Sequence, residues 1–199
     1  MADKTLQAVQ ATSSQRLTAD QFEAHYLNQP YELWEGQLVK VSPTVGLHGI
    51  ILSKVNYELQ AFCKSHAIQG ELFVGDTGFR LSNITLRAPD VAFVGQVKMA
   101  TVQDLQKFLP FAPDLAVEVI SPSDRAGTVQ KKLELYTEAH TPLIWFIYEN
   151  APRVVVYEWG KPFRVVRLSG MLDGGEVLPG LQIPVADLFP PQTPPQPTT

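Results

Sequence analysis

The sequence predicts an α/β domain in which a mixed β-sheet is flanked by α-helices. Two long helical patterns alternate with short strand patterns along the chain, which is the order typical of such a domain. The segment 143–148 is apolar throughout, as a strand buried on both faces of a sheet requires. With 199 residues, of which 45% are hydrophobic and 18% charged, the chain is long enough to bury one core.

The first part of the chain begins with a short helix and two short strands. Thr18 supplies the capping chemistry for the helix, and the strands at 31–36 and 37–41 meet at a turn on Gly36. The next pattern predicts a long amphipathic helix over 47–64. Its apolar stripe repeats every three or four residues and consists of Ile51, Val55, Leu59 and Phe62.

The second part alternates strands with one more helix. Short β-rich runs predict strands at 71–74, 78–81, 89–94 and, after a polar stretch, 114–120. Helix-start residues at 121–124 lead into a helix that runs to about residue 138. The remaining expected elements are a hairpin at 143–148 and 153–159, a strand at 163–168, a glycine-rich turn at 173–175 and an apolar segment ending near 189.

The two ends of the chain are expected to lie outside this domain. Residues 1–16 lack periodicity and the apolar core of a secretory signal, so they predict a flexible N-terminus. Residues 190–199 form a proline- and threonine-rich tail that predicts disorder, which leaves a single domain over 17–189.

Composition limits the environment and the class of function. No apolar stretch approaches the roughly 20 residues of a membrane span, and the single Cys63 cannot form an internal disulfide. These features predict a cytoplasmic protein that does not contact membranes. The net charge of −4 argues against a non-enzymatic nucleic-acid coat, which needs a basic surface. It is compatible with a metal-dependent nuclease, whose site is itself acidic.

Two carboxylates stand where neighbouring strands could bring them together. Glu118 lies inside the apolar strand 114–120, and Asp90 begins the run 90–94 directly after a proline. Taken singly, a salt-bridged glutamate and a turn aspartate are the more common readings. As a pair, they predict a site for Mg²⁺ or Mn²⁺, completed by the backbone carbonyl of Val119. Such an ion activates water and stabilises the charge on a phosphate during hydrolysis.

Three further polar residues are candidates for the same catalytic site. Lys132 lies on the apolar side of its helix, where the alternative is a lysine whose stem covers the apolar face while its amine reaches solvent. Glu32 interrupts the apolar strand at 31–34, and the alternative is a surface glutamate. His48 begins the long helix, where it could instead bond a nearby backbone group.

Five motifs occur in a characteristic order. They are Tyr31-Glu-Leu-x-Glu-Gly36, His48, Arg87-x-Pro-Asp-Val-Ala-Phe-Val94, Val117-Glu-Val-Ile-Ser-Pro-Ser-Asp124 and Lys132-x-x-x-Tyr136. In this order they resemble the Uma-two family of endonucleases, over roughly residues 17–189. The resemblance implies the restriction-endonuclease-like, or PD-(D/E)XK, fold: a mixed β-sheet core flanked by helices.

The resemblance also implies roles for the candidate residues. Asp90 corresponds to the aspartate of the PD motif and Glu118 to the acidic residue of the (D/E)XK motif. Ile120 stands where the wider superfamily has lysine, and Lys132 on the following helix takes that place. Glu32 corresponds to an extra acidic residue near the N-terminus.

Two positions depart from the family pattern. Thr128 replaces an acidic residue four positions before Lys132, and 147–149 lacks the usual Val-Asp ending. Neither departure alters the expected metal ligands.

The resemblance implies Mg²⁺-dependent (or Mn²⁺-dependent) hydrolysis of phosphodiester bonds in DNA. It also implies a homodimer, because enzymes of this fold that cut both strands often present two sites. One alternative is a degenerate nuclease fold that binds nucleic acid or assembles with proteins, which would lack metal binding dependent on Glu118. Another is a hydrolase of a different phosphoester, which substrate screening would reveal.

Overall fold

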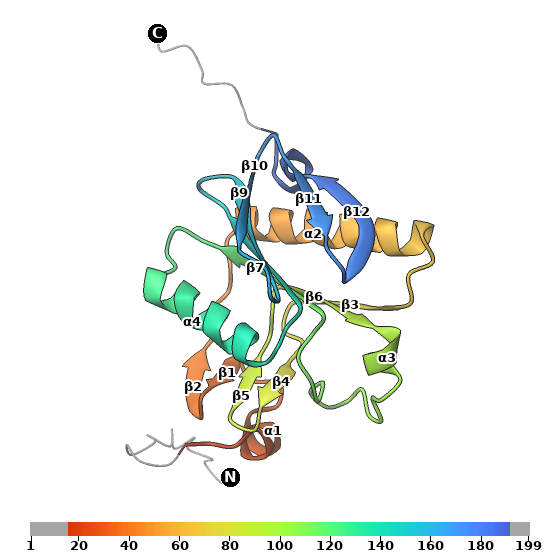
Figure 1. The fold of residues 1–199 in the computed structure, drawn as a ribbon. Helices are drawn as coiled ribbons and strands as arrows, with labels where there is room; N and C mark the ends of the chain where they lie inside the picture. The colour runs from red at the N-terminus through yellow and green to blue at the C-terminus, as the bar shows by residue number, and fades with distance from the viewer. Residues whose placement is uncertain (1–15, 192–199) are drawn as a thin grey trace, which may run out of the picture.

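The computed structural model describes residues 16–191 and has a large mixed sheet with helices on both faces, a smaller four-stranded sheet beside it and a two-stranded sheet near the C-terminal end of these residues (Figure 1). The terminal segments expected to be flexible, 1–16 and 190–199, lie almost entirely outside the described residues. The elements in chain order are α1 (Ala19–Tyr26), β1 (Tyr31–Trp34), β2 (Gln37–Lys40), α2 (Gly46–Ser65), β3 (Gly70–Val74), β4 (Phe79–Ser82), β5 (Thr85–Arg87), β6 (Val91–Gly95), α3 (Gln96–Met99), β7 (Leu115–Ile120), α4 (Ala126–Glu138), β8 (Leu143–Tyr148), β9 (Arg153–Glu158), β10 (Arg164–Arg167), β11 (Met171–Gly174), β12 (Leu178–Pro184) and the 3₁₀-helix η1 (Val185–Leu188).

The central sheet has six strands in the order β10-β9-β8-β7-β6-β3. β7 and β8 pair in parallel, and the other neighbouring strands pair antiparallel. The parallel pair requires a crossover, which α4 supplies between β7 and β8. The sheet is therefore mixed and flanked by helices, as the sequence predicts.

The two faces of β7 pack against different helices. Leu115, Val117 and Val119 belong to the core cluster that contains the apolar stripe of α2. Ala116 and Ile120 point the other way and pack in the cluster that contains Tyr136 of α4. Figure 1 shows α2 and α4 on opposite sides of the sheet. Glu118 shares the α4 face, because side chains two residues apart on a strand point the same way.

The smaller sheet, β2-β1-β5-β4, carries α1. Phe22 of α1 packs on Leu33 of β1 and Leu86 of β5, and the last two are partners across the strand pair. The residues beside them, Glu32 and Arg87, consequently lie on neighbouring strands. β5 of the smaller sheet leads through Pro89 and Asp90 into β6 of the central sheet. Asp90 therefore lies at the junction of the two sheets.

Some local expectations were wrong. The sequence predicts no strand at β5 and no helix at α3, which have only three and four residues. The helix-start residues at 121–124 do not cap α4, whose N-cap is Arg125 without a side-chain cap. Asp124 instead accepts a hydrogen bond from the Ser121 amide at 2.8 Å, which closes the preceding turn. Within residues 16–191, no helix has the length and apolarity to cross a bilayer.

Candidate active site

Glu118 is a buried carboxylate with three side-chain donors. Its Oε1 accepts hydrogen bonds from Arg87 Nη2 at 2.6 Å and from Tyr136 Oη at 2.7 Å. Its Oε2 accepts a hydrogen bond from Lys132 Nζ at 2.6 Å. A buried carboxylate is tolerated only when cations and donors compensate it. Arg87 of β5, and Lys132 and Tyr136 of α4, provide that compensation.

This cluster keeps Glu118 and Lys132 charged at neutral pH. Burial alone would raise the pKa of Glu118, but the charges of Lys132 and Arg87 outweigh it and lower this pKa to about 2. Burial opposes the charge of Lys132 as well, yet its pKa is raised because Glu118 stabilises the ammonium. Lys132 is therefore a proton donor and a cation, not a base, in this state.

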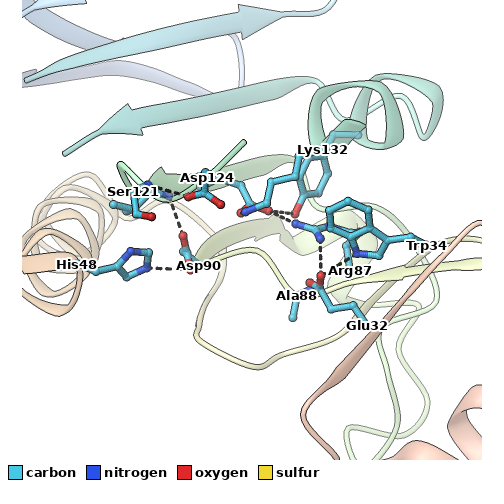
Figure 2. Close-up of polar contacts among 12 residues, drawn as sticks. Glu32, Trp34, His48, Arg87, Ala88, Asp90, Ser121, Asp124 and Lys132 are labelled. Atoms are coloured by element: carbon cyan, nitrogen blue, oxygen red, sulfur yellow. Dashed lines mark hydrogen bonds and ion pairs between the residues drawn. The ribbon is translucent and has the colours of Figure 1, made fainter. Parts of the chain in front are cut away.

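Arg87 connects Glu118 to Glu32. Its side chain is only 1% exposed, and Nη1 donates to Glu32 Oε2 while the guanidinium lies 4.5 Å from the centre of the Trp34 ring (Figure 2). Glu32 also accepts hydrogen bonds from Trp34 Nε1 at 2.8 Å and from the Ala88 amide at 2.9 Å. Burial raises the pKa of Glu32, against which the Arg87 charge acts. Arg87 thus links Glu32 to Glu118 by one hydrogen bond to each carboxylate.

Asp90 lies beside Glu118 at the edge of the cluster. β6 pairs with β7 at Val91 and Val117, so one further step places Asp90 next to Glu118. Asp90 Oδ2 accepts a hydrogen bond from the Val119 amide at 2.7 Å. With 23% of its side chain exposed, Asp90 is the more accessible of the two carboxylates.

His48 lies in the first turn of α2 and bridges two carboxylates. Its Nε2 is 3.3 Å from Asp90 Oδ1 (Figure 2). Its Nδ1 is 3.0 Å from Glu149 Oε1. The hydrogen bond to Asp90 raises the pKa of His48, burial lowers it, and the charges of Asp90 and Glu149 raise it further, with a net increase. As an imidazolium, His48 donates from both nitrogens, one to each carboxylate. The alternative of a backbone-bonded His48 does not match these contacts.

Comparison with protein families decides the family of the chain. The Uma2 family, described as "Putative restriction endonuclease", matches residues 19–186. The chain belongs to the Uma2 family. The family expected from the five motifs is thus confirmed, and the candidate residues lie inside the matched range.

Comparison with solved structures confirms the fold of this Uma2 protein. The chain superposes with a TM-score of 0.73 on the crystal structure described as "a putative nuclease belonging to DUF820 from Anabaena variabilis ATCC 29413". The match covers 87% of this chain and 97% of that chain, at 20% sequence identity. The restriction-endonuclease-like fold is therefore confirmed. No curated protein matches the chain.

The donor set of the Uma2 site fits a hard cation in its chemistry. Asp90 and Glu118 offer carboxylate oxygens, which Mg²⁺ and Mn²⁺ prefer. The Ile120 carbonyl points toward β8, where it accepts a hydrogen bond from the Glu149 amide. Because backbone groups alternate along a strand, the carbonyl of Val119 faces the other side, where Asp90 lies. Among residues 16–191 no group of three His, Cys, Asp or Glu side chains is arranged to hold a metal ion, so water and substrate would complete the coordination.

Three residues of the site are not among the candidates that the sequence predicts. In the sequence, Arg87 and Tyr136 stand only as members of motifs, and Glu149 only as part of a departure from the family pattern. Tyr136 could have been found, since it lies one helical turn after Lys132 and on the same face. Arg87 and Glu149 carried no local signal, because their partners Glu32 and His48 are 55 and 101 residues away.

Proposed function

We propose that this Uma2 protein is a metal-dependent endonuclease that hydrolyses phosphodiester bonds in DNA. The proposal depends on one observation: Asp90 and Glu118 lie side by side at the junction of β6 and β7, with the ammonium of Lys132 on Glu118. Two carboxylates and a cation are the groups that metal-assisted phosphodiester hydrolysis requires. The family and the fold support the same chemistry.

The metal ligands in this proposal are Asp90, Glu118 and the carbonyl of Val119. When bound, Mg²⁺ or Mn²⁺ lowers the pKa of a coordinated water and offsets negative charge on the phosphate. Asp90 is held for this role from two sides, by the Val119 amide and by His48. His48 in turn is fixed by Glu149, so the carboxylate of Asp90 has little freedom to rotate. Such support of a ligand reduces the cost of ordering it.

Lys132 supplies positive charge for the phosphate. In hydrolysis, a water oxygen bonds to phosphorus while the bond to one ester oxygen breaks, and negative charge grows on the phosphate oxygens and on the leaving oxygen. A protonated Lys132 can stabilise that charge by hydrogen bonding. Because Lys132 is protonated, the proton lost by the attacking water passes to another acceptor or to solvent.

Arg87 and Glu32 position the catalytic carboxylate. Arg87 and Tyr136 hold Oε1 of Glu118, which leaves Oε2 as the oxygen that faces Lys132. Glu32 anchors Arg87 through a charged contact inside the small sheet. These residues act through Glu118 and are not expected to touch the substrate.

Plasmid cleavage and metal titration test the proposal together. Wild-type protein should nick plasmid only with Mg²⁺ or Mn²⁺, and Asp90→Asn and Glu118→Gln should abolish nicking. The control is Glu134→Gln, an exposed carboxylate on the same helix as Lys132, which should cleave like the wild type. Calorimetric titration should show metal binding that is lost in Asp90→Asn. Full activity of Asp90→Asn with intact fold would overturn the proposal.

A second candidate is a nuclease fold that has lost catalysis and serves in binding or assembly. It is favoured by the saturation of Glu118, whose two oxygens already accept three side-chain hydrogen bonds. This candidate predicts no Mg²⁺ or Mn²⁺ binding that depends on Asp90 or Glu118, and no nicking of plasmid under any metal condition.

A further inference from the structure

A row of residues crosses the end of the central sheet, starting beside the candidate active site. Ile120 of β7 pairs with Tyr148 of β8, Tyr148 with Arg153 of β9, and Arg153 with Arg167 of β10. Directly paired residues point to the same face of a sheet. Since Ile120 follows Glu118 by two residues, the row lies on the same face as Glu118. Three strand spacings separate its ends, which is about 14 Å.

The outer end of this row is a pair of like charges. Arg153 and Arg167 face each other across β9 and β10, an arrangement that destabilises a sheet when nothing neutralises it. Within residues 16–191 neither arginine forms an ion pair with a carboxylate. Arg153 lies 4.1 Å from the centre of the Tyr148 ring and donates to the Ala151 carbonyl at 3.1 Å. A bound anion would relieve the repulsion.

The start of α4 shows a second unfavourable arrangement of charge. Arg125 is its N-cap, the cap makes no side-chain hydrogen bond, and the first turn has no acidic residue. A cation at the positive end of the dipole of a 13-residue helix costs stability. The nearby carboxylate of Asp124 is engaged by the Ser121 amide. The free amides at this helix end are, like the two arginines, suited to an anion.

The two arrangements border the same hollow. A hollow of about 410 Å³ is lined by Asp124 and Ala126 at the start of α4 and by Tyr148, Arg153 and Tyr157 of the sheet. An adjoining hollow shares Arg153 and is also lined by Arg167. The first hollow thus borders the loop after β7, and the second extends from Arg153 to Arg167 at the outer end of the row.

We propose that this surface, defined by Tyr148, Arg153, Arg167 and the start of α4, binds the phosphodiester backbone of a nucleic acid beside the cleaved bond. The inference rests on the proposed function, since it takes the substrate to be nucleic acid. Guanidinium groups bind phosphate through paired hydrogen bonds, and the tyrosine rings offer a face for a base. The row of about 14 Å corresponds to about four steps along one strand of a duplex. Local positive charge of this kind gives a protein of net charge −4 a surface for a polyanion.

Binding measured without metal separates this inference from catalysis. The probe is a short fluorescein-labelled DNA duplex in EDTA, followed by anisotropy over a range of salt concentrations. The test variant is Arg153→Gln/Arg167→Gln. The control is Lys64→Gln/Lys107→Gln, which also removes two exposed charges. Lys64 lies in the last turn of α2, which leads into β3. β3 and β10 form the two opposite edges of the central sheet.

Loss of two phosphate contacts has a defined signature. The slope of log affinity against log salt should become shallower by about 1.8, so between about 50 and 200 mM salt the wild type should lose about twelvefold more affinity than the test variant. The control pair should keep the wild-type slope. The melting temperature of the test variant should equal or exceed that of the wild type, because the like-charge pair is gone.

The outcomes distinguish the two proposals. A shallower slope and weaker binding in the test variant alone support the inference. Equal binding by the test variant and the wild type overturns the inference, and so does a wild type that binds no duplex. In either case, plasmid cleavage tests the nuclease proposal separately. Weaker binding by the test variant, combined with no cleavage by the wild type with any metal, supports the binding surface and overturns the hydrolytic function.

Discussion

Replacing Glu118 by glutamine should destabilise the protein strongly at neutral pH and very little near pH 2. The folded structure lowers the pKa of Glu118 to about 2 from an ordinary value of 4.5. A lowered pKa stabilises the fold above pH 4.5, and that contribution is lost as the pH falls through about 2. The gap of about 2.5 pH units corresponds to about 3 kcal/mol, at about 1.4 kcal/mol per unit. Leaving Arg87 and Lys132 without their carboxylate has a cost of the same order, about 3–5 kcal/mol.

Urea unfolding of the wild type and Glu118→Gln at several pH values between 7 and 2 measures this difference. The gap in free energy of unfolding should be largest above pH 4.5 and should close toward pH 2, where a protonated glutamate resembles glutamine. Glu134→Gln is the control, since its partner Lys131 is 3.7 Å away at the surface, where solvent screens the pair. A gap that stays constant with pH, or is below about 1 kcal/mol above pH 4.5, would refute the reasoning.

Three other substitutions test the remaining members of the cluster. Arg87→Met removes the cation shared by two buried carboxylates and should lower the free energy of unfolding in urea by about 3–5 kcal/mol. Adding Glu32→Gln should recover part of this loss, and no recovery would contradict the pairing of Glu32 with Arg87. His48→Asn should reduce metal affinity in calorimetry by about 10–100-fold without unfolding the protein, and unchanged affinity would show that His48 does not support Asp90. Lys132→Gln should lower the cleavage rate by about 10²–10³-fold with the melting temperature monitored in parallel, and an unchanged rate would remove Lys132 from the mechanism.

The long elements of the fold could be predicted because each has a strong local pattern. The stripe of α2 repeats over 20 residues, and β8 is apolar at six successive positions. β5 could not be predicted, because three residues give too short a pattern and its stability comes from pairing with β1 and β4. The N-cap of α4 was misplaced for a different reason. Asp124 has the chemistry of a cap, but its carboxylate forms a turn with Ser121 instead.

The core of the candidate site followed from strand geometry. Alternation along β7 sets the face of Glu118, and the register of β6 sets the position of Asp90 beside it. Lys132 followed from helical periodicity on α4. Arg87 could not be anticipated, because a fully buried arginine is rare and its two carboxylates come from β1 and β7, far apart in the sequence.

A rescue experiment tests whether the lysine of the site must come from α4 or can come from β7. Ile120 and Glu118 point to the same face of β7, so a lysine at position 120 could reach the carboxylate that Lys132 now contacts from α4. If the reaction needs only an ammonium at Oε2 of Glu118, Ile120→Lys/Lys132→Met should recover part of the cleavage that Lys132→Met loses. The ammonium would be buried, which is tolerable only because Glu118 compensates it. Recovery in plasmid nicking, with a melting temperature close to that of Lys132→Met, supports this requirement. A folded double variant as inactive as Lys132→Met would show instead that Lys132 must approach from the helix, with Tyr136 one turn beyond it on the same carboxylate.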